Sequence, residues 1–211
     1  MVEQFNEIYR RHPRYYGESV PVGFRQFLSG RALELWNCLD LGAGQGRYAL
    51  HLARAGARVR AVDFSPVAMA QLALDAEAED LQLTTEVADL CRYDFPVGEY
   101  DLIVGATVLD HLHDPCIQGV AAAVVGALKP GGTMYCEVFT TDDPGCSCLS
   151  EQVASETAGP VLHYFAAGEL RRLFQGLETL VYHEGGKHDK AHGRPHWHGL
   201  ALMIGVKGGA E

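Results

Sequence analysis

The feature that most constrains this chain is a short apolar strand that runs directly into a glycine-rich turn. Residues 38–47 read CLDLGAGQGR, with glycines at every second position of the turn. Such glycines let the backbone turn sharply and leave no Cβ atom between a ligand and the main chain. Asp63 ends the next apolar strand 21 residues after Gly42, near the spacing of about 20 at which a carboxylate accepts hydrogen bonds from ribose hydroxyls. The pattern predicts a site for an adenosine cofactor.

Details of the turn favour one cofactor over another. A dinucleotide fingerprint, G-x-G-x-x-G, holds a pyrophosphate at a helix N-terminus. This chain has G-x-G-x-G preceded by Asp40, and that acid repels a pyrophosphate but suits a ligand with an amino group and a sulfonium. Residues 39–46 closely resemble the first motif of the Rossmann-like, class I methyltransferases that use S-adenosylmethionine. An NAD-binding protein and a purely structural turn are the alternatives.

Later segments resemble the same family in the expected order. Residues 88–90 resemble its adenine-contact motif, residues 100–109 its fourth strand and the loop beside the transferable methyl group, and residues 128–132 the turn before its fifth strand. The resemblance covers about residues 36–140. It implies S-adenosyl-L-methionine as cofactor, S-adenosyl-L-homocysteine as product, and a cofactor site made of Tyr15, Asp40, Gly42, Ala43, Gly44, Gly46, Arg47, Asp63, Phe64, Asp89, Leu90 and Ala106.

Strand-like and helix-like segments alternate along the chain, which is typical of a parallel sheet covered on both faces. We therefore predict an α/β fold with a Rossmann-like, doubly wound sheet. The family resemblance implies seven strands, mostly parallel, with the last two forming a hairpin and the final strand antiparallel. We expect strands near 36–41, 58–63, 81–87, 100–105, 132–140, 177–184 and 197–206, and helices near 46–56, 66–78, 115–128 and 166–175, with another starting after Pro21.

The composition of the chain limits the kinds of partner that we expect it to bind. A chain of 211 residues that is 47% hydrophobic fits one α/β domain. Its net charge of −10 argues against nucleic acid and for a small-molecule substrate, because phosphate-binding surfaces carry a basic excess. No apolar run reaches the roughly 18 residues of a membrane span, and the N-terminus lacks a signal peptide's apolar stretch. We expect a cytoplasmic monomer or homodimer that binds no membrane.

The six cysteines lie at 38, 91, 116, 136, 146 and 148. Two of them fall inside expected buried strands, as reduced cytosolic thiols that behave as small hydrophobes often do. We therefore predict no structural disulfide. We also predict that Cys91 and Cys116 are inert, because no nearby cation stabilises a thiolate.

The first 35 residues form a segment of their own, before a methyltransferase domain at 36–211. Residues 9–17 hold three tyrosines and three arginines. In related methyltransferases such a segment folds over the cofactor, where aromatic rings attract a sulfonium and Arg14 is suited to pair with the methionine carboxylate. Tyr15 is the first choice for a cofactor contact. The alternative is a surface segment whose tyrosines pack on the core.

The C-terminal third carries the acceptor hypothesis. Residues 163–174 and 187–198 resemble segments of the tellurite-resistance methyltransferases, which place histidine and arginine near the substrate. We expect His188, Arg194 and His196 to act there as general base or anion clamp. The alternatives are a metal site, to which His192, His198 and the cysteines at 146 and 148 would contribute, or a solvated turn. We assign no metal ligand.

A second candidate for the acceptor side follows the fourth strand, at residues 110–114 (DHLHD). Asp110 or His111 would line the acceptor site there. Equally, Asp114 and Pro115 fit a helix N-cap with proline in the first turn, and His111 would pack over the adenine.

The expected reaction is direct in-line methyl transfer. The leaving group is already activated, so the protein mainly aligns the reactants, excludes water and supplies a base where the acceptor carries a proton. We predict a small acceptor such as a chalcogen oxyanion, a metalloid or a thiol. The alternatives are O- or N-methylation of a small metabolite, and a non-catalytic regulator that binds S-adenosylmethionine or a metal.

Overall fold

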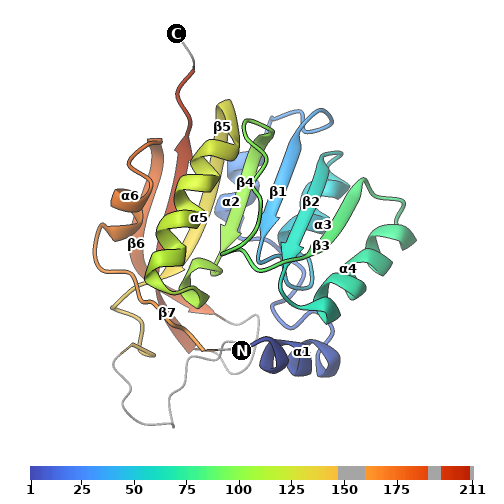
Figure 1. The fold of residues 1–211 in the computed structure, drawn as a ribbon, viewed down its shortest axis with the longest axis horizontal. Helices are drawn as coiled ribbons and strands as arrows, with labels where there is room; N and C mark the ends of the chain where they lie inside the picture. Colours follow the sequence, from blue (N-terminus) through green and yellow to red (C-terminus); the bar gives the residue numbers. More distant parts are fainter. Residues whose placement is uncertain (147–159, 190–195, 210–211) are drawn as a thin grey trace.

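The fold is a single seven-stranded sheet with helices on both faces (Figure 1). The computed structural model describes residues 1–146, 160–189 and 196–209. The strand order is β3-β2-β1-β4-β5-β7-β6, parallel from β3 to β5, with β7 antiparallel to both β5 and β6. The predicted doubly wound α/β fold with its antiparallel final strand is therefore confirmed. The strands are β1 Asn37–Leu41, β2 Arg58–Asp63, β3 Leu83–Val87, β4 Tyr100–Ala106, β5 Leu128–Phe139, β6 Glu178–Asp189 and β7 His196–Val206.

Helices cover the two faces of the sheet and split the core in two. Alternate residues of one strand point to opposite faces, so Leu102 packs on one side with α2 and α3, while Ile103 packs on the other with α5 and α6. None of the helices in the described ranges is long and apolar enough to cross a membrane. The helices are α1 Val2–Arg11, α2 Val22–Leu28, α3 Arg47–Arg54, α4 Pro66–Ala78, the 3-10 turn η1 Leu109–His111, α5 Asp114–Ala127 and α6 Glu169–Leu173.

The order of the strands predicts where a ligand binds. From β1 the chain runs outward through β2 and β3, and it then returns to place β4 on the other side of β1. Ligands of open α/β sheets bind outside the carboxyl ends of the strands at this reversal. The glycine-rich turn follows β1, and the segment 107–113 follows β4, so both meet at the crevice.

Some expected boundaries were wrong. The strand β5 begins at Leu128 rather than near 132, because the residues of the Lys-Pro-Gly-Gly turn join it across an irregular register with β4. The helix α6 is shorter than expected. Helix α5 begins at Asp114 with His113 at the N-cap, one residue before the expected cap, and carries proline in its first turn.

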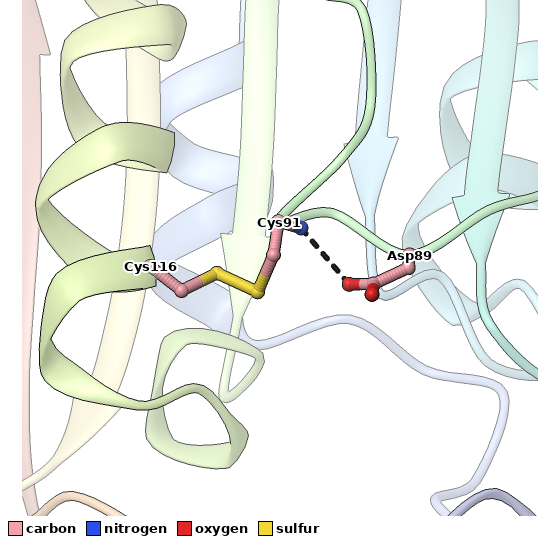
Figure 2. The surroundings of a disulfide bond; sticks show 3 residues. All are labelled: Asp89, Cys91 and Cys116. Atoms are coloured by element: carbon pink, nitrogen blue, oxygen red, sulfur yellow. Dashed lines mark hydrogen bonds between the residues drawn. A yellow bond between two sulfur atoms is a disulfide. The ribbon is translucent and has the colours of Figure 1, made fainter.

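The prediction of no structural disulfide was also wrong. Cys91 and Cys116 form a disulfide with a Cα–Cα distance of 5.3 Å (Figure 2). Their separation of 25 residues hides the contact, because it arises only when the segment after β3 and the first turn of α5 meet at the same edge of the sheet. Neither residue is therefore an inert free thiol. Among the described cysteines Cys38 and Cys136 are free and buried, as expected, and Cys146 is free and exposed.

The N-terminal residues contain a helix that the sequence analysis did not anticipate. In α1, Phe5 and Tyr9 are buried one turn apart. The helix packs against α4 beneath the carboxyl ends of the strands (Figure 1). Asn6 ties it down, because its side-chain oxygen accepts a 2.6 Å hydrogen bond from the buried hydroxyl of Ser65.

Candidate active site

A cavity of about 350 Å³ opens at the carboxyl ends of β1, β2 and β4. This volume lies within the range of small-molecule sites, about 300–1,000 Å³. Its walls come from α1, the glycine-rich turn, the end of β2, the segment after β3 and the segment after β4. The residues that line it include Phe5, Tyr9, Arg14, Tyr16, Gly42, Ala43, Gly44, Arg47, Asp63, Phe64, Ala88, Asp89, Leu90, Cys91, Ala106, Thr107, Val108, His111, Leu112, His113 and Leu162.

The glycine-rich turn has the backbone shape that its sequence predicts. Gly42 has a φ of 61°, and a Cβ atom on it would lie 2.3 Å from Cγ2 of Val108. Gly44 has a φ of 51°, and a Cβ atom there would lie 3.1 Å from the Tyr9 hydroxyl. Any side chain at these positions would strain the turn and crowd the cavity. The turn is thus a cradle in which a ligand meets bare backbone.

Asp63 lies at the end of β2 on the cavity wall, almost fully buried. Its Oδ2 accepts a 2.9 Å hydrogen bond from the amide of Gly44, and its Oδ1 accepts a 2.8 Å bond from the amide of Ser65. Burial raises the pKa of this carboxyl, and the amide bonds oppose the rise. A carboxylate has about four lone-pair sites, more than these amides occupy. The group is therefore fixed in place and still able to accept hydrogen bonds from ligand hydroxyls.

Asp89 and Leu90, which follow β3, also line the cavity. The Oδ1 atom of Asp89 accepts a 3.0 Å hydrogen bond from the amide of Cys91 (Figure 2). Leu90 is buried in the core, and the amide of Ala88 donates to the carbonyl of Asp63 at 3.0 Å. The two acidic side chains are thereby held on neighbouring strand ends.

The structure brings nine of the twelve predicted cofactor residues to the cavity wall. Asp40, Gly46 and Tyr15 are the three outside it. The buried Oδ2 of Asp40 accepts a 2.9 Å hydrogen bond from the amide of Ala49 in α3, and burial raises the pKa of Asp40 to about 7. Gly46 is the N-cap of α3. Asp40 and Gly46 therefore join the glycine-rich turn to the start of α3 and do not line the cavity.

A residue that the motif analysis passed over, Gln45, fastens the N-terminal segment to the glycine-rich turn. Its Oε1 accepts a 2.7 Å hydrogen bond from the amide of Tyr15, and its Nε2 donates to the carbonyl of His12 at 3.0 Å. Arg47 adds a 3.1 Å bond to the carbonyl of Tyr16. As a result Tyr16 lies on the cavity wall, whereas the Tyr15 ring packs beside it with a centroid distance of 4.9 Å.

Arg14 borders the cavity but has partners of its own. Its Nη1 donates to the carbonyl of Gln45 at 2.9 Å, and its Nη2 pairs with Asp75 at 2.8 Å. Asp75 therefore neutralises part of the charge that we expected to face a methionine carboxylate.

The segment after β4 forms the far wall of the cavity. Thr107 has a φ of 50°, which is uncommon for a residue with a branched side chain, and its amide donates to the carbonyl of Glu137 at 2.8 Å. This backbone places the following residues, including His111, against the cavity. Strain of this kind collects at functional sites.

His111 presents a defined ring nitrogen to that wall. Its Nδ1 lies 2.8 Å from the carbonyl oxygen of Pro160, and a carbonyl only accepts, so Nδ1 carries the hydrogen. Burial lowers the pKa of His111, so the ring is neutral near pH 7 and Nε2 is an unprotonated acceptor. The edge of the ring packs on Phe5 of α1 at a centroid distance of 5.2 Å.

Asp110 supports this wall from behind. It is fully buried, its Oδ1 accepts a 2.7 Å hydrogen bond from the amide of Phe139, and its carbonyl accepts one of 2.7 Å from the amide of Leu162. Burial raises the pKa of Asp110 well above its ordinary value. Asp110 therefore positions Leu162 on the wall and does not itself line the cavity.

The C-terminal histidines form a separate cluster. The Nε2 atoms of His196 and His198 lie 2.7 Å apart, and Nδ1 of His198 lies 2.9 Å from the buried Oδ2 of Asp143. His188 packs on Trp197 at a centroid distance of 5.3 Å. None of these three histidines lines the cavity.

Part of the C-terminal hypothesis falls outside the described residues, namely Arg194, His192 and the cysteine at 148. Within the described ranges no group of three or more histidine, cysteine or acidic side chains is arranged to hold a metal ion.

The sheet order, the glycine cradle and the two acids at successive strand ends define a class I, S-adenosylmethionine-dependent methyltransferase domain. Residues 38–132 match the family model described as a methyltransferase domain, and the chain carries a domain of this class that resembles the TehB subfamily. The expected family resemblance is confirmed.

Three relatives illustrate the similarity. "Hemagglutinin 1" of Eikenella corrodens is 32% identical over 175 residues, which are 81% of this chain and 54% of that protein. An Escherichia coli "Ubiquinone biosynthesis O-methyltransferase" is 34% identical over 123 residues, 56% of this chain and 48% of that protein. "Probable S-adenosyl-L-methionine-dependent methyltransferase TehB" of Haemophilus influenzae is 28% identical over 147 residues, 69% of this chain and 47% of that protein.

The solved structure of Haemophilus influenzae TehB superposes with a TM-score of 0.73 at 21% identity, covering 97% of this chain and 67% of that one. This likeness shows the fold. The chain spans about half the length of the curated relatives it matches.

Proposed function

We propose that this protein transfers a methyl group from S-adenosylmethionine to a small-molecule acceptor. The observation that carries the proposal is the cavity in which the glycine cradle, Asp63 and Asp89 face one space. The donor set fits the cofactor, since carboxylates accept from ribose hydroxyls and from the adenine amino group, and bare backbone leaves room for the methionine part. When bound, S-adenosylmethionine supplies a sulfonium-activated methyl group.

In this proposal Asp63 holds the ribose, while Asp89 and Leu90 hold the adenine beside Phe64. The predicted covering role of residues 1–35 also belongs here. Tyr9 and Tyr16 of that segment border the cavity over the glycine-rich turn, where aromatic rings favour a sulfonium cation. The segment thereby excludes water from the donor.

On the acceptor side, His111 is the group best placed to take a proton. His111 lines the cavity and its Nδ1 is bonded to Pro160, which leaves Nε2 as the acceptor nitrogen, whereas the histidine cluster of β7 lies outside the lining. An acceptor with a hydroxyl or thiol would donate its hydrogen to Nε2 while its oxygen or sulfur meets the methyl group. Leu112 and Leu162 supply apolar surface to the lining beside His111.

Two acceptor classes follow. The resemblance of residues 163–174 and 187–198 to the tellurite-resistance methyltransferases favours the soft acceptors that we predicted, namely a chalcogen oxyanion, a metalloid or a thiol. The similarity to ubiquinone O-methyltransferases and the neutral His111 favour a hydroxyl instead. The hairpin residues His188, Arg194 and His196 stay a prediction for an anionic acceptor, which the arginine charge and imidazole N–H donors would attract.

A methyl-transfer screen over tellurite, selenite, arsenite, thiols, phenols and amines tests the proposal. We expect transfer to at least one small acceptor, a large loss in His111→Gln when that acceptor carries a proton, and a smaller loss in His196→Ala. His183→Gln, an exposed residue of β6, is the matched control. If wild-type protein binds no S-adenosylhomocysteine in calorimetry, the proposal is wrong. Binding without transfer to any acceptor would favour a regulator.

A further inference from the structure

The disulfide lies in the crossover from β3 to β4, which runs from the edge of the sheet past β2 and β1. This crossover, residues 88–99, contains no helix or strand, although parallel strands of one sheet are usually connected through a helix. The segment is held by the buried Leu90, by Tyr93 and Phe95, whose rings meet at 4.8 Å, and by the bond from Cys91 to Cys116. Besides the peptide bonds to β3 and β4, the disulfide is its one covalent link to a regular element among the described residues.

This crossover supplies the adenine side of the cavity. Residues 88–91 all line it. Cys91 stands two residues after Asp89, and its amide donates to the carboxylate of Asp89 (Figure 2). A shift of Cys91 therefore moves a predicted adenine contact directly.

The same disulfide closes a loop that includes the acceptor side of the cavity. The covalent loop from Cys91 to Cys116 contains all of β4 and the segment after it. The lining residues within the loop are Ala106, Thr107, Val108, His111, Leu112 and His113. The bond thus fixes the adenine wall relative to the acceptor wall.

The bond is open to chemical attack. Cys91 is exposed and borders the cavity, whereas Cys116 is half-buried at the start of α5. The greater exposure of Cys91 makes it the expected point of attack by a thiolate from solvent. The pair is distinct from Cys38 and Cys136, which are buried inside strands.

We infer that Cys91 and Cys116 are a redox modification site, reduced by a dithiol, whose state sets the affinity for the nucleoside cofactor; this rests on the proposed function. A reductant thiolate attacks Sγ of Cys91 and breaks the Cys91–Cys116 bond. The thiolate released on Cys116 takes a proton from water. The second thiol of the reductant then resolves the mixed disulfide, so the reductant becomes a disulfide and the pair gains two electrons and two protons.

Reduction frees the crossover to sample more conformations, and the cofactor must then order it on binding. We expect reduction to weaken cofactor binding about 5-fold or more, the lower end of typical coupling between sites. By reciprocity, bound cofactor makes the pair harder to reduce by the same factor. Cytosolic thiol systems keep most cysteines reduced, so the tight form is the one made under oxidising conditions.

The test uses calorimetry of the whole chain with S-adenosylhomocysteine, before and after dithiothreitol, with alkylation and mass spectrometry to record the state of each cysteine. Oxidised wild type and oxidised C146S are expected to bind equally tightly. Reduced wild type, and C116S in either condition, are expected to bind about 5-fold or more weakly. C116A repeats the test in case serine disturbs packing, and circular dichroism confirms folding of both.

Equal affinity within 2-fold in the oxidised and reduced states would overturn the inference. So would alkylation of both cysteines in fully oxidised protein. If no form binds S-adenosylhomocysteine, the proposed function fails instead. The redox site is then judged by hydrogen exchange over residues 88–99, which must accelerate on reduction; unchanged exchange overturns it as well.

Discussion

The two halves of the cavity are built in different ways. The cofactor half uses residues at the ends of successive strands, a turn after β1, an acid that ends β2 and an acid after β3, with the two acids held by backbone amides. The acceptor half combines distant segments, with His111 after β4 bonded to Pro160 and Leu162 held by Asp110. The Cys91–Cys116 bond joins the halves. The residues proposed to bind the methyl donor are therefore positioned by the strand ends, whereas those proposed to bind the acceptor are positioned by contacts between distant segments.

The largest effect is expected where the halves are joined. Closing a loop of this length with a disulfide stabilises a protein by about 3 kcal/mol in the chain-entropy model. C116S should therefore lower the free energy of unfolding by about that much in urea, without dithiothreitol. C146S should unfold as wild type does. If C116S loses no stability, the bond does not constrain the chain and the halves are joined by packing alone.

In the cofactor half, Asp63→Ala should weaken S-adenosylhomocysteine binding by about 1.5–3 kcal/mol, the usual worth of hydrogen bonds to a charged group. The change also leaves the amides of Gly44 and Ser65 without their acceptor. Glu86→Gln, an exposed acid on the adjacent strand β3, is the control. Equal calorimetric affinity in Asp63→Ala and wild type would remove Asp63 from the site.

In the acceptor half, the prediction is a pH dependence. Burial lowers the pKa of His111, so its Nε2 loses the ability to accept only when the pH falls below the ordinary histidine value of about 6.5. For an acceptor that loses a proton, kcat should decrease at low pH, with the decrease lying below about pH 6.5. His111→Gln should lower kcat about 100-fold at neutral pH and should remove this pH dependence. His183→Gln should keep the wild-type profile. If kcat of His111→Gln still decreases at low pH as in wild type, another group is responsible for that pH dependence.

The same shift affects stability with a defined sign. A buried neutral histidine binds fewer protons in the folded state than in the unfolded state near its ordinary pKa. His111 therefore lowers the free energy of unfolding as the pH drops below about 6.5, and the contribution is absent above it. The His111→Gln variant should lose less stability than wild type between pH 7 and pH 5.

The contrast between the halves also explains what could be predicted from the sequence. Gly42, Asp63 and Asp89 follow successive strands, so their spacing alone brought them to one edge of a parallel sheet. The order of the last two strands came from the family resemblance, and the structure confirms it. Helix α1 was missed because a polar segment hid its buried pair, Phe5 and Tyr9.

The remaining features depend on contacts between distant residues. The anchoring role of Gln45 exists only once residues 12–16 fold back over the turn. Cys91 and Cys116 meet only when the crossover after β3 lies beside α5. Sequence spacing carries no record of either contact. Whether His188 and His196 serve the acceptor stays a prediction, because their neighbours on the cavity side are set by tertiary structure.

The most direct test of the central claim is hydrogen exchange with and without S-adenosylhomocysteine. If one cofactor occupies the described cavity, slower exchange is expected in the turn at 42–47, after β2 at 63–65, in the crossover at 88–91 and after β4 at 107–113. Exposed residues 179–184 of β6 should be unchanged. Protection confined to β6 and β7, or no protection at ligand concentrations that saturate binding, would contradict the assignment of the cavity as the cofactor site.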